Sequence, residues 1–297
     1  MLSGIICLDK PEGITSFSAV RAVRRITGEK KEGHAGTLDP MATGVLPVFM
    51  GAATRFIELL PDHGKSYRAG VRPGITTDTL DITGTVTGGS APSFTKEELL
   101  AVLDSFKGKQ LQLPPMYSAI SKNGVRLYDL ARQGIEVERD KREIEINSLE
   151  LIDFNPETHE FIIDVKCSKG TSIRSLASDI GEPLGCGAAL YSLRRPSACG
   201  FNITSAVTIE ELEKSENPES YIIPVWRVFS EYPAIYVSPA QAKRFANGGG
   251  LSIQRLKAKV NTGYYRVFSP EKAFLGIGEV TQDSDEMAVK RVYTGND

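Results

Sequence analysis

The sequence predicts an α+β fold, in which strands and helices follow one another without regular alternation. Amphipathic helical segments occur singly between strand-like segments, unlike the repeating strand-helix units of a doubly wound fold. No GxGxxG run and no Walker loop occurs anywhere in the chain. Short β segments dominate beyond about residue 231, and 297 residues are enough for one large and one small domain.

The predicted strands are short apolar or alternating runs bounded by turn residues. Residues 4–11 (GIICLDKP) are apolar enough for a buried strand, whereas residues 65–74 (KSYRAGVRPG) alternate as a half-buried strand does. The predicted strand segments are 4–11, 44–51, 65–74, 81–89, 143–154, 160–168, 233–237, 264–269, 273–280 and 288–293.

Helical spacing of apolar residues, together with capping residues, predicts the helices. Two segments open with a capping box, Thr95 with Glu98 and Thr208 with Glu211. A third is expected to begin at Ser16 or Ser18 and to end at a glycine. The predicted helical segments are 16–28, 54–61, 95–106, 170–185, 208–215 and 238–250.

The chain is predicted to divide into a large domain at residues 1–230 and a small β domain at residues 231–297. A proline-broken, basic and aromatic stretch interrupts the large domain at about residues 110–145. Because this stretch lacks a core-like apolar pattern at its start, we expect an inserted arm on a compact domain.

The composition is that of a globular protein, with 41% hydrophobic and 24% charged residues. The N-terminus has no basic region ahead of an apolar run, and no apolar segment approaches the roughly 20 residues that span a bilayer. These features predict a cytoplasmic protein without membrane contact.

The cysteines and histidines predict neither disulfides nor a metal site. The four cysteines are scattered without CxxC spacing, so we expect reduced and mostly buried thiols. The three histidines are not at ligand spacing, which makes a zinc site unlikely to form. Any chemistry is therefore expected to proceed without a bound transition metal.

The charge is unevenly distributed along the chain. The formal net charge of −2 does not indicate a nucleic-acid binder, but a polyanion senses only the surface that it touches. Basic residues cluster at 21–31, at 107–132 and around Lys257. Each cluster alone is most simply a solvated face, whereas together they make a basic surface plausible.

Asp39 is the only acid in the loop sequence GHAGTLDPMATGVLPV, residues 33–48. An aspartate before proline is usually a turn residue, so this is the simpler interpretation. The alternative is a carboxylate held on a glycine-tight loop for catalysis, which needs a cationic partner to stay ionised. Arg174 is a candidate partner, but spacing alone does not bring the two together.

His34 and Tyr67 are further candidates with equally ordinary alternatives. A lone loop histidine is usually a hydrogen-bonded structural residue, although it can be a base or a ligand. Tyr67 lies on a predicted strand, where an aromatic ring usually packs in the core. These residues suggest an active loop and do not by themselves define a reaction.

The motifs resemble those of the tRNA pseudouridine-55 synthases, the bacterial TruB family. GHAGTLDPMATGVLPV is similar to the catalytic loop of that family, and the order and spacing of the other motifs match over nearly the full chain. The other matching motifs are LDKPEGITS, KSYRAGVRPGITTDTLDITG, LPPMYSAISKNGVRLYDLARQGIEV and VKCSKGTSIRSLASDIGEPLGCGAALYSLRR. The segment containing AFLGIGEV resembles, more weakly, a small PUA RNA-binding domain.

The resemblance implies a fold and a reaction. It implies a pseudouridine-synthase core with a mixed, mainly antiparallel sheet flanked by helices, followed by a PUA-like domain. Asp39 is implied as the carboxylate that attacks the target uridine or its ribose, and Arg174 as its ion-pair partner. Tyr67 is implied to stack on the flipped base and to help remove the C5 proton.

The resemblance also implies supporting and binding roles. Leu193 is expected to pack against the uracil, and His34 to fill the space left by the extruded nucleotides. Lys10 and Pro11 are expected to support the catalytic loop from beneath. Ser172 stands where the family often has an aromatic residue, so any base contact from that position is weakened or replaced.

The expected activity is conversion of uridine to pseudouridine at position 55 in the T loop of tRNA, without cofactor or metal. The partner implied is the T arm of tRNA, and the protein is expected to be a monomer. Two alternatives share the motifs: a guide-RNA-dependent relative, and a tRNA-folding chaperone in which modification is secondary. Without the resemblance, a carboxylate hydrolase also stays open.

Overall fold

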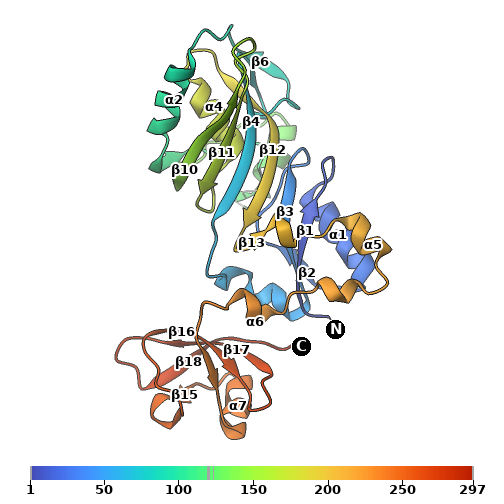
Figure 1. Cartoon of the computed structure of the whole chain (residues 1–297), viewed down its shortest axis with the longest axis vertical. Helices are drawn as coiled ribbons and strands as arrows, with labels where there is room; N and C mark the ends of the chain where they lie inside the picture. Colours follow the sequence, from blue (N-terminus) through green and yellow to red (C-terminus); the bar gives the residue numbers. More distant parts are fainter. Residues whose placement is uncertain (1, 119–120, 123, 296–297) are drawn as a thin grey trace.

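A computed structural model describes residues 2–118, 121–122 and 124–295 and contains one large sheet that runs through the upper two thirds of the molecule (Figure 1). Its strand order is β1-β3-β12-β4-β11-β10-β7, with β2 on β3 and β13 on β12. Within the described residues, β12 and β3 form the one parallel pair of this sheet. The predicted mixed, mainly antiparallel sheet is confirmed. Its strands are β1 (Gly4–Lys10), β2 (Glu32–His34), β3 (Thr43–Met50), β4 (Lys65–Pro73), β7 (Gly108–Gln112), β10 (Arg142–Phe154), β11 (Phe161–Cys167), β12 (Ala188–Ala198) and β13 (Phe201–Asn202).

Helices cover the sheet at both of its ends. At the end drawn at the top of Figure 1, α2 packs against β10, and α4 packs against β12 and β4. Beside β1 and β3, α1 and α5 contact each other. The helices are α1 (Ser16–Thr27), α2 (Lys96–Ser105), α3 (Leu127–Arg132), α4 (Ile173–Gly181), α5 (Ile209–Lys214), α6 (Val225–Val228) and α7 (Pro239–Ala246), with 3-10 segments η1 (Gly51–Leu59), η2 (Ile203–Ser205), η3 (Pro218–Tyr221) and η4 (Ile253–Arg255). No helix among the described residues is both long and apolar enough to cross a membrane.

Side-chain caps set several helix starts. Both predicted capping boxes, at α2 and α5, are confirmed. The predicted cap of α1 is wrong, because Thr15 accepts the hydrogen bond from the Ser18 backbone N–H. Ser16 lies one residue further on, and its hydroxyl binds the loop that carries Asp39 instead.

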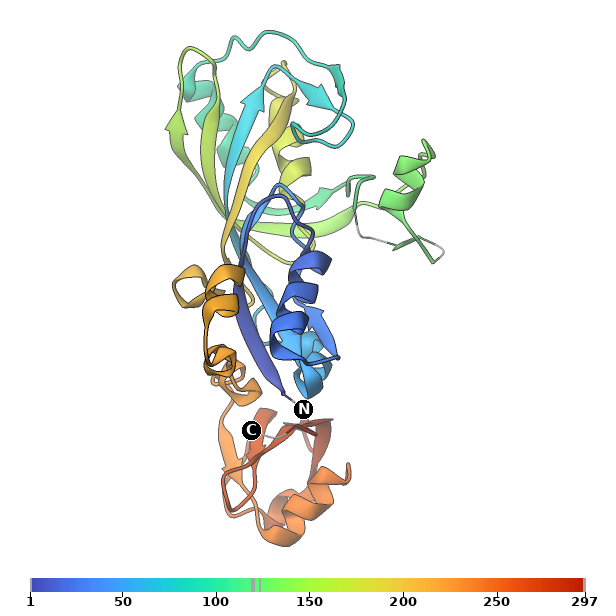
Figure 2. The same cartoon turned by 90° about the vertical axis from the view of Figure 1, so that its right-hand side faces the viewer.

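The predicted arm leaves the sheet between β7 and β10. Strand β7 ends at Gln112 and β10 begins at Arg142, so the described residues between them, 113–118, 121–122 and 124–141, lie off the sheet. Figure 2 shows this segment projecting from one side of the body, with its short strands β8 (Ser121–Lys122) and β9 (Val125–Arg126) and helix α3. Residues 119, 120 and 123 of the predicted arm lie outside the described residues.

A second sheet, of five strands, forms the lower body in Figure 1. An aromatic contact joins it to the rest of the chain: the ring of Phe56 in η1 packs against Phe229, Phe274 and Tyr293. All four rings are buried, so the contact is a continuous apolar core rather than a loose tether. The strands are β14 (Ala234–Tyr236), β15 (Leu251–Ser252), β16 (Gly263–Phe268), β17 (Phe274–Val280) and β18 (Glu286–Val292).

The cysteines follow the sequence-based expectation. Cys7, Cys167, Cys186 and Cys199 are all buried and free of disulfides. They belong to the apolar clusters of the large sheet and its surroundings, where a thiol packs as a small hydrophobic group.

Candidate active site

The loop from residue 35 to residue 42 connects β2 to β3 and carries Asp39. Each backbone carbonyl from Gly36 to Pro40 accepts a hydrogen bond from the protein. Arg195 donates to Gly36 and Thr37, and the hydroxyl of Ser16 donates to Leu38. The N–H groups of Ala42 and Gly13 donate to Asp39 and Pro40, respectively. A loop whose carbonyls are all bound to the protein is fixed in one shape before any substrate arrives.

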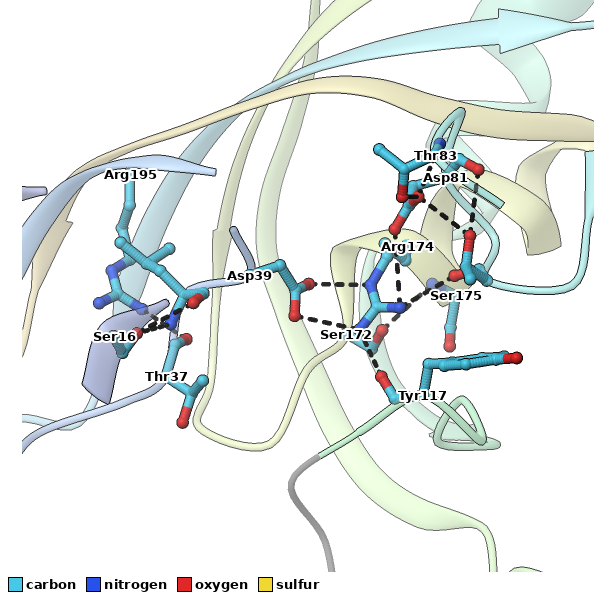
Figure 3. A network of polar contacts seen from close by, with 12 residues as sticks. Ser16, Thr37, Asp39, Asp81, Thr83, Tyr117, Ser172, Arg174, Ser175 and Arg195 are labelled. Atoms are coloured by element: carbon cyan, nitrogen blue, oxygen red, sulfur yellow. Dashed lines mark hydrogen bonds and ion pairs between the residues drawn. The ribbon is translucent and has the colours of Figure 1, made fainter. Parts of the chain in front are cut away.

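Asp39 and Arg174 form a two-pronged ion pair across this loop (Figure 3). Arg174 Nε lies 2.9 Å from Asp39 Oδ2, and Arg174 Nη2 donates to Asp39 Oδ1 at 3.2 Å. The arginine side chain is 8% exposed, whereas the aspartate side chain is 36% exposed. The carboxylate is therefore oriented by a buried cation while one side of it stays open to solvent.

Two opposing effects act on the Asp39 carboxyl. Burial raises its pKa, and the Arg174 guanidinium opposes that rise by stabilising the charged form. The Asp81 carboxylate pushes the pKa in the same direction as burial. Arg174 is thus the main partner that keeps Asp39 ionised.

Arg174 also connects the pocket to two other segments. Its Nη1 donates to the carbonyl of Thr79 at 2.9 Å and lies 3.7 Å from the Asp81 carboxylate. Its Nη2 donates at 2.7 Å to the carbonyl of Tyr117, in the arm. Figure 3 shows these partners gathered around one guanidinium. The arm, the turn after β5 (Thr76–Thr77) and the Asp39 loop therefore share a single buried cation.

A pocket opens beside the ion pair. Asp39, Tyr67, Ser172, Arg174 and Leu193, all predicted site residues, line it. The arm closes one side of the pocket through Pro114, Pro115 and Ser118. The structure thus brings together side chains from the loop, two strands, one helix and the arm.

Tyr67 and Leu193 form apolar walls of this pocket. They lie on the adjacent strands β4 and β12, and their side chains are almost completely buried. Burial raises the pKa of the Tyr67 hydroxyl, and the positive charge of Arg195 opposes the rise. Tyr67 therefore both packs in the core and presents its ring to the pocket.

Ser172 has a structural partner as well as a place in the pocket. Its hydroxyl caps α4 by accepting from the Ser175 backbone N–H at 3.2 Å. Its backbone N–H and carbonyl are both bound by the side chain of Gln112, at 2.8 and 3.1 Å. The Ser172 hydroxyl thus fixes the first turn of α4, the helix that carries Arg174.

Lys10 lies beneath the loop, fully buried. Its Nζ donates to the carbonyls of Pro11, Ile14 and Pro40 at 2.7, 2.8 and 3.4 Å. Burial lowers the pKa of Lys10 to about 8. His34 lies apart from the residues that line the pocket, on β2 opposite Val48, and burial lowers its pKa as well.

The match to known families decides the identity. Residues 24–173 match the model described as "TruB family pseudouridylate synthase (N terminal domain)". The chain belongs to the TruB family. Residues 174–225 and 233–293 match two further models, described as "tRNA pseudouridylate synthase B C-terminal domain" and "Pseudouridine synthase II TruB, C-terminal".

Individual relatives of this TruB-family enzyme match over nearly their full lengths. A protein named tRNA pseudouridine synthase B from Clostridium kluyveri is 43% identical and covers 93% of this chain and 95% of its own. One of the same name from Azoarcus sp. is 44% identical, over 94% of this chain and 91% of its own. A chain of the archaeal box H/ACA sRNP Nop10-Cbf5 complex shares the fold, with a TM-score of 0.72 and 24% identity over 99% of this chain and 87% of that one.

Sequence reasoning missed three residues that build the TruB-family site. Ser16 clamps the backbone of Leu38 from both sides, and Asp81 is a buried carboxylate near Arg174. Arg195 is fully buried against the Asp39 loop. Strand alternation could have found Arg195, because an inward Leu193 places the side chain two residues later on the same face.

Proposed function

We propose that this protein isomerises uridine to pseudouridine at position 55, in the T loop of tRNA, with Asp39 as the catalytic carboxylate. The observation that carries the proposal is the Asp39–Arg174 pair at the edge of a pocket walled by Tyr67 and Leu193. The names of the relatives support tRNA as the substrate.

The reaction asks little of the protein besides a carboxylate and a fixed pocket. Asp39 attacks the target nucleotide, the bond from N1 to C1′ breaks, and the uracil turns. C5 then joins C1′ while the bond to Asp39 breaks and frees the carboxylate; the C5 proton leaves with the help of Tyr67, and N1 gains a proton. The product has the same atoms as the substrate, so the overall change needs no oxidant, reductant or group donor.

The pocket suits a base taken out of its stack. Extruding a base from a folded RNA costs a few kcal/mol. Stacking against a protein ring returns about 1–3 kcal/mol per base, which Tyr67 can supply from one wall while Leu193 closes the other. We assign His34, which lies outside the pocket, to contact with the RNA that surrounds the extruded base.

Arginines on α1 support RNA binding next to the site. Helix α1 starts at Ser16, which touches the Asp39 loop, and it carries no acidic residue. Arg21 and Arg24 are exposed and have no acid within 4 Å among the described residues, whereas Arg25 pairs with Glu213. Figure 2 places this helix between the arm and the lower body. A phosphate backbone running from the pocket along α1 would meet unpaired positive charge.

We assign residues 1–230 to catalysis and residues 231–297 to a PUA-like RNA-binding domain. In this view the arm and the C-terminal domain grip the T arm from either side of the pocket. We expect a cytoplasmic monomer. The likeness to the H/ACA protein is one of fold, and no contact among the described residues favours guide-RNA dependence or a purely chaperone role.

The deciding experiment is a single-turnover assay on a tRNA transcript, with the modified position mapped. The wild-type protein is expected to form pseudouridine at position 55 alone. Asp39→Asn is expected to bind the tRNA within about threefold of wild type and to form no product, because the amide is not a nucleophilic carboxylate. Asp164→Asn, in an exposed ion pair with Arg68, is the matched control and should stay active.

Three outcomes would contradict the proposal in different ways. Product at another position would refute the substrate site, and substantial turnover by Asp39→Asn would refute the mechanism. Rescue of a deletion strain by Asp39→Asn would favour the chaperone alternative.

A further inference from the structure

Arg195 is the largest side chain that the fold buries completely. It lies on β12 with 0% exposure, and no acid lies within 4 Å of it among the described residues. Burying a guanidinium without an acidic partner costs free energy, so the groups that accept its hydrogen bonds indicate its role in the fold. Arg195 is not among the predicted site residues.

Among the described residues, the guanidinium donates three hydrogen bonds, all to backbone carbonyls of the Asp39 loop or of the strand that follows. Nη2 donates to Gly36 at 2.9 Å, Nη1 to Thr37 at 3.3 Å, and Nε to Val45 at 2.8 Å. These bonds hold the loop just before Asp39 and again just after it. Loss of the guanidinium would remove the donor from the buried carbonyl of Val45 and from the partly buried carbonyls of Gly36 and Thr37.

The backbone of Arg195 holds the same loop at its exit. It pairs in parallel with Gly44, the second residue of β3. Gly44 has φ +107°, and a Cβ there would lie 2.3 Å from the Arg195 carbonyl oxygen. Residue 195 therefore contacts both ends of the loop through its side chain, and its main chain contacts the exit of the loop as well.

The same side chain also reaches Tyr67. The positive charge of the guanidinium also acts on the Tyr67 hydroxyl, on the neighbouring strand β4, where it opposes the rise in pKa that burial causes. Its neighbour Arg194 alternates outward, where it pairs with Asp9 at 2.9 Å and is 46% exposed. Adjacent arginines thus have different surroundings, one at the surface and one beneath the pocket.

We propose that Arg195 is a positioning residue for the isomerisation: one buried guanidinium fixes the Asp39 loop and places its positive charge where the Tyr67 hydroxyl senses it. The inference rests on the proposed function of this pocket. Arg195 touches neither substrate nor reacting atoms, and it acts through the two groups that do. Misplacement of such groups by a small distance is enough to slow a reaction severely.

The test compares Arg195→Met, Arg195→Lys and the control Arg194→Met in single-turnover and tRNA-binding assays. Arg195→Met is expected to bind tRNA within about threefold of wild type but to react about 100-fold more slowly. Arg195→Lys keeps the charge with a single donor group and is expected to recover about tenfold of that loss. Arg194→Met should react within about twofold of wild type.

A Tyr67→Phe background tests whether Arg195 acts partly through the hydroxyl. The rate loss from Arg195→Met should be smaller in that background than in wild type, because one of its two targets is already gone. A folded Arg195→Met or Arg195→Lys variant with a rate within threefold of wild type would overturn the inference. So would equal losses in both backgrounds together with a parallel loss of tRNA affinity. The wild-type product map tests the proposed function separately, since it does not depend on Arg195.

Discussion

Replacing Arg174 by methionine tests whether the ion pair keeps Asp39 ionised or merely holds it in place. The two charges lie about 4 Å apart, and at an effective dielectric constant of about 20 they interact by about 4 kcal/mol. Because the Asp39 side chain is 36% exposed, solvent screening reduces this to about 2 kcal/mol. At fixed pH, that difference corresponds to about thirtyfold in the ionised fraction of a weakly ionised carboxyl.

The sign of the effect follows from the directions of the two influences. Burial already raises the pKa of Asp39, and Arg174 opposes the rise, so its removal moves the pKa further upward. The variant should therefore lose most activity in acid and recover part of it as the pH rises. The assay is the single-turnover rate between pH 5.5 and 9 on one tRNA transcript, alongside its dissociation constant.

Arg68→Met is the matched control for this measurement. Arg68 forms a comparable two-pronged pair with Asp164, at 2.8 and 2.7 Å, but on the exposed face of β4 and away from the pocket. Its pH profile should superimpose on that of the wild type. If Arg174→Met lowers the rate by the same factor at every pH, the ionisation argument is wrong, and Arg174 acts only by holding the loop, the turn and the arm together.

Three further predictions concern the support of the site. Ser172→Ala should lower the free energy of unfolding by about 1 kcal/mol through loss of the α4 cap, and its single-turnover rate should stay within threefold of the wild-type rate. A tenfold slower rate at unchanged stability would instead indicate that Ser172 contacts the substrate. Phe274→Ala should lower the free energy of unfolding in urea by about 3–5 kcal/mol, because it removes a ring from the aromatic contact that joins the second sheet to the rest of the chain. Phe17→Ala is the control: its side chain is 68% exposed, so the free energy of unfolding should change by less than about 0.5 kcal/mol. Equal effects of the two substitutions would contradict a stabilising role for this contact. Lys10 has a pKa of about 8 in the folded protein, below its ordinary value, so above pH 8 the unfolded chain binds more protons than the folded protein does. The free energy of unfolding of the wild type should therefore rise by about 2 kcal/mol from pH 8 to pH 10, relative to that of Lys10→Met. A difference between the two proteins that stays constant with pH would refute this.

Local patterns predicted the elements whose signals are themselves local. The capping boxes at Thr95 and Thr208 need only four consecutive residues, and both form as expected. The cap of α1 was mispredicted because Thr15, Ser16 and Ser18 are all competent hydroxyl residues. A contact with Leu38, 22 residues away, engages Ser16, and no local rule contains that information.

The site residues show the same division. Asp39 stood out as a lone acid before proline, but its partner lies 135 residues later in the chain. Spacing could not join them, because the contact depends on how β3 and β12 come together in the sheet. The family resemblance supplied the pair, and the structure supplies its geometry. The alternation of inward and outward side chains along the strand, counted from the inward Leu193, predicts that Arg195 points inward. Without that pattern, two consecutive arginines indicate an exposed, charged surface.

The hydrogen bonding of the loop explains why the acid precedes a proline. Pro40 has no N–H, so the loop has no donor to satisfy at that residue, and proline also disfavours helical backbone at Asp39. The carbonyls on either side are bound by Arg195, Ser16, Ala42 and Gly13. Since its carbonyls are already bound by the protein, the loop has few main-chain acceptors left for a substrate. In the proposed mechanism, the open side of the Asp39 carboxylate faces the nucleotide, and the rigid loop beneath it holds the carboxylate in place.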